Sequence, residues 1–509
     1  MMKSALEWKG CESVAKFNVL TDPWIPVERV DGSQEMLGIA DTLAHAHELH
    51  GIVCRSPLET YAVKRLLTAF LMDALKPQER AELKALFRAE HFPVDRINDY
   101  IALCEAEGAS FDLFDEKRPF MQAAYDEALD KEKKKPVAVL VHEFPSGNNH
   151  VHFDHRLQTE HRLTYAEALR ALCASYVFCT SGLSGPSSVN NTPCTYILCD
   201  EDNLFRTLVL GMVSKSECGK IPMDDLPVAW RSDKKIVPAE QCADMSVLAA
   251  FTWMPRRVTL IPDAEEGYVK EVYIQPGLNF LGNGRWMDPH VAYRKNKKEE
   301  WYSVKPQSGR EFWRDIGMIA AAYQENASHI PPLAVAHYEK ITNRQESLVR
   351  LNMTGLVTNQ AQYLSLQCET LSLPPAILEI PEKGEFLREK MMLIESIAGC
   401  VESSYGKLEA SAARQLLALY FSSIRDALFS EFLPLLGKSD SEQENWQMPL
   451  ISLLENRILD TLKKVSDEAA GMFGAGAKNL IKLTKATDVC MGKSWSILKK
   501  SRGEEVYAD

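Results

Sequence analysis

Histidines are concentrated in one short stretch of this sequence. Five of the twelve lie between residues 142 and 161: His142, His150, His152, His155 and His161. Imidazole rings at close spacing, with Asp154 among them, can bind a catalytic metal, so a metal-dependent hydrolase is one hypothesis. No second cluster of carboxylates accompanies them, however, and on a strand His150 and His152 would share one face. We therefore favour a polar loop in which His152 and Phe153 contact phosphates or bases of a nucleic acid.

Two glycine-rich segments are similar to enzyme motifs, but each lacks a required residue. GMFGAGAKNL at 471–480 would form a phosphate-binding loop only with lysine at position 477, which is alanine. SGLSGPSS at 181–188 would form a nucleophile elbow only with glycine at position 186, which is proline. The sequence therefore predicts no catalytic residue and no cofactor. Ser181, Gly182 and Gly185 could still let the backbone approach a ligand closely, with a plain flexible loop as the alternative.

The C-terminal segment concentrates positive charge in an otherwise acidic chain. The whole protein has 58 basic and 70 acidic residues and a net charge of −12. Between Gly471 and Gly503, the single acid Asp488 is accompanied by Lys478, Lys482, Lys485, Lys493, Lys499, Lys500 and Arg502. A helix with Lys478, Lys482 and Lys485 near one face would bind phosphates without reading sequence, and a solvated helix surface is the alternative. Because the chain is acidic overall, nucleic-acid binding would need partners to supply further positive charge.

A pair of amides, Asn359 and Gln360, lies in a stretch that we expect to connect helical segments. Asn and Gln side chains each present a donor and an acceptor, a combination suited to the edges of bases. Ordinary turns contain the same residues. The pair alone is therefore weak support for DNA recognition.

Length and composition indicate a globular protein of two or three domains. A chain of 509 residues exceeds what one hydrophobic core usually serves, and 46% apolar with 25% charged residues is ordinary. The N-terminus lacks the apolar core of a secretory signal, and no run reaches the roughly 18 apolar residues of a membrane span. We therefore expect a cytoplasmic protein without membrane contact. The twelve cysteines form no CxxC pair and are expected to be buried thiols.

The expected elements divide the chain near Pro375. We predict a strand pair at residues 16–30 and helices at residues 58–90. The charged run 130–135 is predicted to be a solvated turn or helix end. From 136 to 290 short β-rich runs such as VAVLVHEF and VLAAFTWM dominate. After Leu373-Pro374-Pro375, four amphipathic segments separated by glycines predict an antiparallel four-helix bundle. The predicted fold is therefore α+β, with a mixed α/β domain at 1–375 and a four-helix bundle at 376–509.

Five segments, in order along the chain, resemble the CasA family, the large subunits of type I-E CRISPR Cascade surveillance complexes. They are VLTDPWIPV (19–27), FDLFDEKRPFMQ (111–122), FTWMPRRVTLIPD (251–263), NGRWMDPH (283–290) and VTNQA (357–361). The resemblance implies a non-catalytic subunit that recognises the protospacer-adjacent motif (PAM) in double-stranded DNA. Asn359, Gln360 and Ala361 match the family's wedge, which enters the duplex beside that motif and starts R-loop formation.

The resemblance assigns three further contacts. Ser181 to Gly185 would meet the minor groove, although this chain has Asn190 and Asn191 where the family typically has two glycines. Lys270 is the nearest match to a basic finger that approaches the same groove. A loop from Asn148 to His155, with His152 and Phe153, would meet the guide RNA or neighbouring subunits.

The resemblance also implies a set of partners in antiviral defence. They are the backbone, small, guide-end and RNA-processing subunits of the complex, the guide RNA, double-stranded target DNA and a separate helicase–nuclease that cuts. No metal is implied. Besides the hydrolase that would use His150 to His155, a purely structural scaffold without DNA contact is the remaining alternative.

Overall fold

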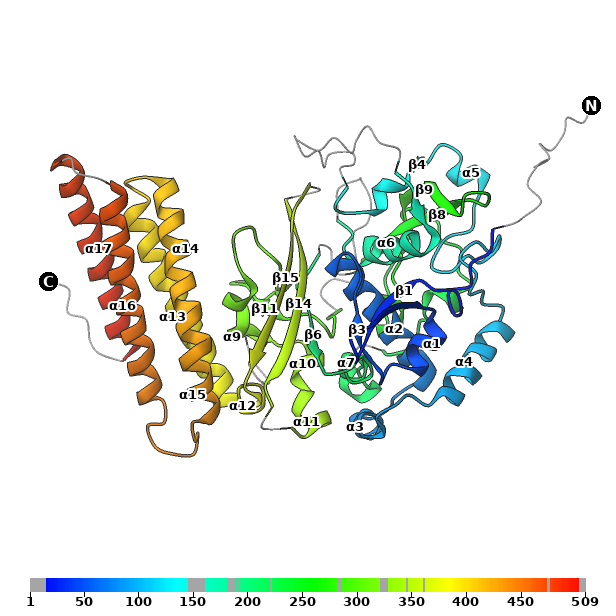
Figure 1. Cartoon of the computed structure of the whole chain (residues 1–509). Coiled ribbons are helices and arrows are strands. Elements are labelled where there is room, and N and C mark those ends of the chain that lie inside the picture. The colour runs from blue at the N-terminus through cyan, green and yellow to red at the C-terminus, as the bar shows by residue number, and fades with distance from the viewer. Residues whose placement is uncertain are drawn as a thin grey trace, which may run out of the picture. The chain divides into compact units, whose positions relative to one another are not determined.

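The computed structural model describes residues 15–144, 161–180, 189, 193–219, 222–281, 286–320, 328–344, 347–359, 362–473 and 477–502. The chain forms two compact units (Figure 1). Unit 1 comprises residues 1–311, 332–343 and 350–371, and unit 2 comprises 312–331, 344–349 and 372–509. The largest change of unit therefore falls at 371/372, close to the proline-rich segment. The stretches 312–331 and 344–349 also belong to unit 2, although the sequence placed them in the first domain.

The core of unit 1 is built around one long helix, α2 (Pro57–Leu75). Ser56 caps its N-terminus by accepting a hydrogen bond from the backbone N–H of Leu58, and Pro57 suits the first turn because it has no N–H to satisfy. Almost every side chain of α2 is buried, and the helix packs against α4 (Val94–Ala106), α6 (Tyr165–Val177), α7 (Leu204–Gly211) and α8 (Val247–Phe251) (Figure 1). A helix buried on all sides carries apolar residues all round, as this one does.

Short sheets surround that core. β1 (Ile25–Arg29) pairs antiparallel with β2 (Gln34–Leu37) and β3 (Leu49–Ile52). β9 (Tyr268–Pro276) pairs antiparallel with β8 (Arg256–Asp263), β4 (Lys134–Pro136) and β5 (Leu163–Thr164). β14 (Val349–Asn359) lies between β6 (Tyr196–Asp200) and β15 (Gln362–Leu373). Two smaller pairs are β7 (Gln241–Cys242) with β10 (Asn279–Phe280) and β11 (Tyr293–Lys295) with β12 (Trp301–Ser303).

The remaining helices of unit 1 are α1 (Ile39–Ala44), α3 (Arg80–Ala89), α5 (Glu127–Asp130), α10 (Leu333–Ala336) and α11 (Tyr338–Thr342). The region 136–290 is less β-rich than the sequence predicted, because it contains α6, α7 and α8. The runs VAVL (137–140) and VLAAF (247–251), interpreted as strands, form a 3₁₀ turn and a helix. A short, fully apolar run is compatible with a buried strand and with a buried helix, so the sequence pattern alone does not distinguish them. In these two runs, tertiary packing favours helical structure.

Unit 2 contains four long helices. They are α13 (Pro381–Tyr405), α14 (Ala410–Ala427), α16 (Met448–Phe473) and α17 (Ala477–Ser501). α13 packs against α14 and α17, and α16 packs against the same two helices (Figure 1). The short helices α9 (Ile316–Ile319), α12 (Pro375–Glu379) and α15 (Leu433–Lys438) complete the unit, with the two-residue strand β13 (His329–Ile330). The mixed content of helix and strand in the chain confirms the α+β class.

One turn of unit 2 departs from regular α-helix geometry. Residues Leu428–Phe432 form a π-helical turn between α14 and α15. Pro434 follows in the first turn of α15. Proline has no N–H and its ring collides with the carbonyl four residues earlier, so a widened turn at this point relieves the clash.

Candidate nucleic-acid interface

The predicted wedge lies at the join of two long strands. β14 is the central strand of its sheet, and its pairing with β6 runs from Arg350 opposite Asp200 to Thr354 opposite Tyr196. Asn359 is the last residue of β14, its side chain is exposed, and β15 resumes at Gln362. The sequence expectation that helices flank this segment is therefore wrong: two strands do. Gln360 and Ala361, between them, lie outside the described residues.

Several other predicted contact residues also lie outside the described part of the chain. They are Ser181, Gly182, Gly185, Asn190 and Asn191 of the glycine-containing loop, and His152 and Phe153 of the histidine-rich loop. The segments on either side of these loops are described, and they show where the loops begin and end.

Those flanking residues come together in unit 1. His142, six positions before Asn148, directs its Nε2 to the carbonyl oxygen of Phe178 at 3.3 Å. Its ring centroid lies 5.0 Å from that of Tyr363, which is two positions after Ala361. The phenol of Tyr363 is hydrogen-bonded to Thr180, the residue before Ser181. Three segments that are far apart in the sequence therefore start or end within one contact network.

Burial makes this junction a fixed one. Desolvation lowers the pKa of His142 and raises the pKa of Tyr363, so both side chains are neutral near pH 7. Phe178, Cys179 and Thr180 are buried, and the guanidinium of Arg256 donates to the Thr180 carbonyl oxygen at 2.9 Å. The sequence analysis did not single out Tyr363, and its position just after the wedge was the only signal for it.

The side chain of Lys270, the predicted basic finger, is held by two ion pairs that the sequence did not indicate. Its ammonium lies 3.0 Å from a carboxylate oxygen of Glu266 and 3.3 Å from one of Asp263. Hydrogen bonds to Glu266 and then to Asp263 raise the pKa of Lys270. Two carboxylates around one ammonium leave the end of the β8–β9 hairpin with net negative charge, so Lys270 must leave these partners to reach a phosphate.

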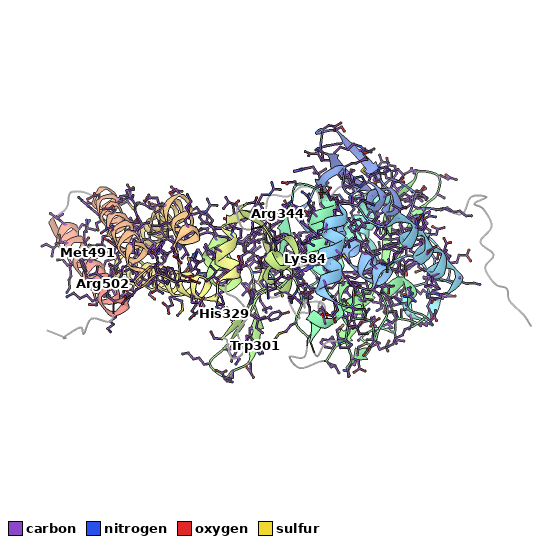
Figure 2. The ribbon with its side chains drawn as sticks, turned by 90° about the horizontal axis from the view of Figure 1, so that it is seen from below. Lys84, Trp301, His329, Arg344, Met491 and Arg502 are labelled. Atoms are coloured by element: carbon purple, nitrogen blue, oxygen red, sulfur yellow. The ribbon has the colours of Figure 1, made fainter. Side chains whose placement is uncertain are left out.

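The lysines of α17 lie on a helix, as the sequence predicted. Lys482 and Lys485 lie one turn apart on α17, and both side chains are exposed. Lys478 lies on the same helix, and its side chain is outside what the structure describes. Met491 and Arg502 mark the course of α17 toward its end (Figure 2).

Among the histidines that the structure describes, His142 and His161 contact aromatic rings. His161 stacks on Phe144 with ring centroids 4.5 Å apart, and His142 belongs to the junction above. Within the described residues, no group of three or more His, Cys, Asp and Glu side chains could hold a metal ion. His150, His152 and His155 are not among them, so the hydrolase hypothesis stays open to experiment. The described cysteines are free thiols, most of them buried.

Residues of the five family-like segments mainly hold the core together. Trp24 is buried and donates its indole N–H to the carbonyl oxygen of Val19 at 2.8 Å. Gln122 links two distant segments, donating to the Leu113 carbonyl oxygen and accepting from the Leu260 N–H, both at 2.7 Å. The segment 283–290 supplies Asp288 and His290 to a buried cluster. Sequence reasoning treated these segments as family markers and missed their structural role.

Asp288 and His290 surround Arg65, a fully buried cation of α2. The Arg65 guanidinium donates to Asp288 at 2.7 and 3.2 Å and lies 3.9 Å above the ring of Phe251. His290 directs Nε2 to the carbonyl oxygen of Gly211 at 2.8 Å and Nδ1 to the hydroxyl of Tyr61 at 2.9 Å. Burial lowers the pKa of His290 to about 4, so its imidazole is neutral near pH 7. The cluster is closed to solvent and acts in packing.

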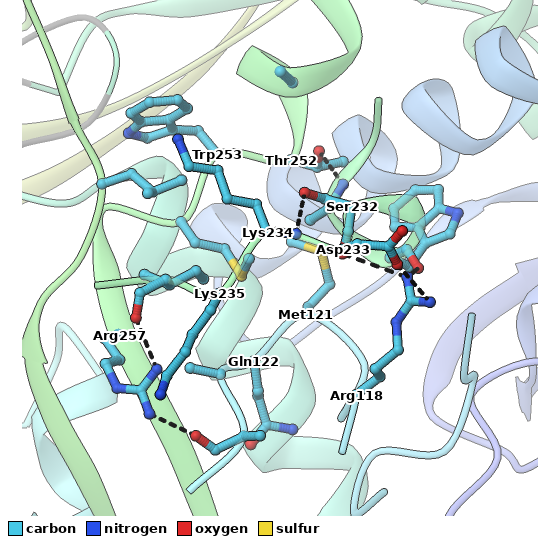
Figure 3. Close-up of a pocket in the computed structure, with 18 of the residues that line it drawn as sticks. Arg118, Met121, Gln122, Ser232, Asp233, Lys234, Lys235, Thr252, Trp253 and Arg257 are labelled. Carbon is cyan, nitrogen blue, oxygen red and sulfur yellow. Dashed lines mark hydrogen bonds and ion pairs between the residues drawn. The ribbon is translucent and has the colours of Figure 1, made fainter. Parts of the chain in front are cut away.

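The main cavity of unit 1 has a volume of about 650 Å³ (Figure 3). Four of its five lining cations are each engaged by an acid: Arg118 with Asp233, Lys234 with Glu240, Lys235 with Asp126 and Arg257 with Asp130. The fifth is Lys117. Trp253 and Met121 contribute apolar surface (Figure 3). Neighbouring carboxylates therefore already neutralise most of the positive charge of this cavity.

Comparisons with known proteins agree with this architecture. The family model described as CRISPR-associated protein Cse1 matches residues 18–463. The CRISPR-associated protein CasA/Cse1 of Thermus thermophilus is 30% identical over 420 residues, covering 76% of this chain and 76% of that protein. The solved structure of Thermus thermophilus CasA has a TM-score of 0.73 at 24% identity, covering 94% and 100% of the two chains. A chain titled CRISPR RNA-guided surveillance complex has a TM-score of 0.73 at 17% identity, covering 94% and 99%.

One further finding concerns membranes. Among the residues that the structure describes, no helix combines the length and the apolar character that crossing a bilayer requires.

Proposed function

The chain belongs to the CRISPR-associated Cse1 family, also called CasA, and we propose that it is a non-catalytic large subunit of a Cascade surveillance complex. In this role it recognises the PAM in double-stranded DNA, wedges the duplex open and helps to recruit the helicase–nuclease. The partners are the other subunits of the complex and its guide RNA. The solved relative whose title names an RNA-guided surveillance complex supports the assembly by its shared fold.

The junction of His142, Thr180 and Tyr363 is the observation that carries the proposal. A DNA-reading surface needs the wedge, the groove-contacting loop and the guide-contacting loop at one place, because PAM recognition, strand opening and capture by the guide follow one another directly. The described flanks of all three segments meet at this junction. Neutral anchors, of which His142 and Tyr363 are half-buried, give each loop a base from which to contact DNA.

Asn359 is the described residue best placed to act in the wedge. It is exposed at the end of an 11-residue strand that neighbours β15 on one side and pairs with β6 on the other over Arg350–Thr354. A rigid strand can push its end against a base pair without bending back, and the amide can form hydrogen bonds with a base edge. Lost contacts of this kind cost about 1–3 kcal/mol, roughly 5–150-fold in affinity.

The acidic character of the chain is compatible with this role. DNA affinity depends on phosphate neutralisation, which a chain of net charge −12 does not supply as a whole. We infer that partner subunits supply most of the positive field and that the lysines of α17 guide the unwound strand locally. The cytoplasm, where a guide RNA and its complex assemble, is the proposed compartment.

The test uses the assembled complex and duplexes that carry either an intact or a scrambled PAM. The variant Asn359→Ala/Gln360→Ala is expected to bind the intact duplex roughly 5–150-fold more weakly while its weak binding to the scrambled duplex stays the same. A duplex with unpaired bases beside the PAM should recover part of the loss, since strand opening is then already done. Gln443→Ala, an exposed amide in unit 2, is the matched control.

Two outcomes would contradict the proposed function and support a different one. Unchanged PAM-dependent binding by Asn359→Ala/Gln360→Ala would leave a structural scaffold as the function. Stoichiometric metal in the purified protein, together with a hydrolytic activity lost in His150→Ala/His152→Ala, would instead establish the hydrolase.

A further inference from the structure

The helix α17 has two unlike faces. One face packs inside unit 2 through buried residues at helical spacing: Leu483, Ala486, Cys490, Ser494 and Leu498. The opposite face carries exposed residues at steps of three and four: Ile481, Lys485, Asp488, Gly492, Trp495 and Lys499. We call this exposed row the outer face of α17.

Trp495 is the unusual member of the outer face. Trp495 is 40% exposed, the largest exposed fraction among the tryptophans that the structure describes. One turn earlier on the same face stands Gly492, where an added Cβ would meet no atom within 4 Å. Helical side chains lean toward the N-terminus, so the indole of Trp495 borders the open step left by Gly492. The result is a flat aromatic surface beside an empty space.

Positive charge surrounds that open step. Lys485 and Lys499 lie on the outer face, and Lys482, Lys493 and Lys500 lie along its flank, all with exposed side chains. Asp488 is the one acid within the helix. Exposed lysines at successive turns of one helix follow a polyanion, and an aromatic ring among them offers a stacking site to any base.

We propose that the outer face of α17 binds single-stranded DNA, with one base stacked on the indole of Trp495 in the space left by Gly492. The lysines at positions 482, 485, 493, 499 and 500 contact the phosphates on either side. The binding is independent of sequence, since every base has a face to stack. This inference rests on the proposed function, in which the complex opens a duplex and releases one strand, and it identifies where that strand is held.

The charge pattern favours a nucleic acid over a protein partner. The apolar residues Leu480 and Ile481 are exposed near the start of α17, at 59% and 71%, and alone would suit a protein contact. The lysines, however, continue beyond them to Lys500, close to the end of the helix at Ser501. A strand of phosphates presents negative charge along that whole length, whereas a protein would have to carry a matching row of acids.

The experiment uses the assembled complex with three variants and two probes. Trp495→Leu removes the stacking ring, Trp495→Phe keeps an aromatic ring, and Gly492→Leu fills the open step without harming the helix, because leucine is a better helix former than glycine. One probe is an oligothymidylate strand. The other is a PAM-bearing duplex with 2-aminopurine at successive positions of the displaced strand, whose fluorescence falls when the base is stacked.

Trp495→Leu and Gly492→Leu should each weaken oligothymidylate binding about 5–100-fold. Both should also abolish the fluorescence decrease at one or two displaced-strand positions. Trp495→Phe should retain most of both effects. The matched control is Trp301→Leu, the same substitution at a tryptophan of β12 in unit 1 (Figure 2), which should behave as the unaltered protein.

The outcomes separate this inference from the function on which it rests. If PAM-dependent binding is intact but Trp495→Leu and Gly492→Leu change neither probe, the inference is overturned and the proposed function stands. An equal loss in Trp301→Leu would also overturn it, because the effect would not belong to the outer face. Loss of a protein subunit with unchanged DNA binding would make α17 a protein-docking helix. Absence of PAM dependence in the unaltered complex would refute the proposed function, while the oligothymidylate measurement would still test Trp495.

Discussion

The two units place their charged side chains differently. Unit 1 contains ion pairs that are buried almost completely, besides others at its surface: the side chains of Arg257 and Asp130 are each 1% exposed, and those of Arg65 and Asp288 are 3% and 0% exposed. In unit 2, the pair between Arg457 of α16 and Glu431 has exposures of 43% and 38%. Both units have a hydrophobic core of their own. The difference in the burial of their ion pairs therefore comes from the hydrogen bonds that the charged side chains provide.

Irregular backbone explains the buried charges of unit 1. A long helix satisfies its own N–H and C=O groups, but loops need partners for theirs. Arg257 is such a partner, because it donates hydrogen bonds to the carbonyl oxygens of Ile236 and Ala124 as well as to Asp130. One buried guanidinium thus connects three segments that have no sheet or helix in common. The long helices of unit 2 pack mainly through apolar side chains, although the buried Lys383 of α13 also donates to the Gly437 carbonyl oxygen at 3.1 Å.

The largest effect should follow from breaking a buried pair of unit 1. Asp130→Asn leaves the Arg257 guanidinium buried without a counter-charge, which should lower the free energy of unfolding of unit 1 by about 3–5 kcal/mol. Urea unfolding followed by hydrogen exchange in β8 and β9 would measure it. Asp126→Asn, which changes a nearby acid that is partly open to solvent, is the matched control. A loss no larger than that of the control would contradict the connecting role of Arg257.

The next effect depends on pH and tests the carboxylate of Glu217. Its oxygens accept from Arg80 at 2.6 Å, from the Ser214 hydroxyl at 2.8 Å and from His337 at 3.2 Å. Burial alone would raise the pKa of Glu217, but the hydrogen bond and charge of His337, with Arg80, hold it below 4.5. Glu217→Gln should cost about 1–3 kcal/mol at pH 7.

The sign of the pH dependence follows from the lowered pKa. A carboxyl whose pKa is lower in the folded than in the unfolded chain stabilises the fold fully above its unfolded pKa. Its contribution declines as the pH falls below about 4.5. The difference in unfolding free energy between the unaltered chain and Glu217→Gln should therefore be constant above about pH 5.5 and shrink below about pH 4.5. A difference that does not vary with pH would show that the ionised carboxylate is not the stabilising species.

A smaller effect is expected from an apolar change in unit 2. Ile458 of α16 is fully buried between the long helices. Ile458→Val removes one methylene group and should cost about 0.5–1.5 kcal/mol, because the long helices of unit 2 depend on close apolar packing. Thermal unfolding of unit 2, followed by circular dichroism, provides the measurement. Ile481→Val on the exposed side of α17 is the control, with no change expected.

The smallest effect should come from the exposed ion pair of unit 2. Arg457→Gln removes the partner of Glu431, yet solvent already screens both groups, so the unfolding midpoint should stay the same within experimental error. The same guanidinium-to-amide change at Arg257 of unit 1 should unfold the protein at markedly lower temperature. Similar shifts at the two positions would remove the contrast between the units.

The sequence by itself predicted the parts of the chain that have local periodicity. Apolar residues at steps of three and four indicated the long helices after Pro375, because each helix buries one stripe whatever its neighbours are. The same spacing predicted α2 and α3, and the lysine positions placed one basic face on α17. Five family-like segments identified the CasA family, which the family model and the relative then confirmed. Local order and composition were enough for these conclusions.

Only the tertiary structure decided which distant residues meet. No local pattern indicates that Asp130, predicted to lie in a solvated turn or helix end, is buried against Arg257, which is 127 positions away. Nor does any pattern indicate that His142 and Tyr363 lie side by side, or that Lys270 is held by two acids. Such contacts depend on how loops fold over a shared core, and their free energy comes from burial and from partners that local periodicity does not encode.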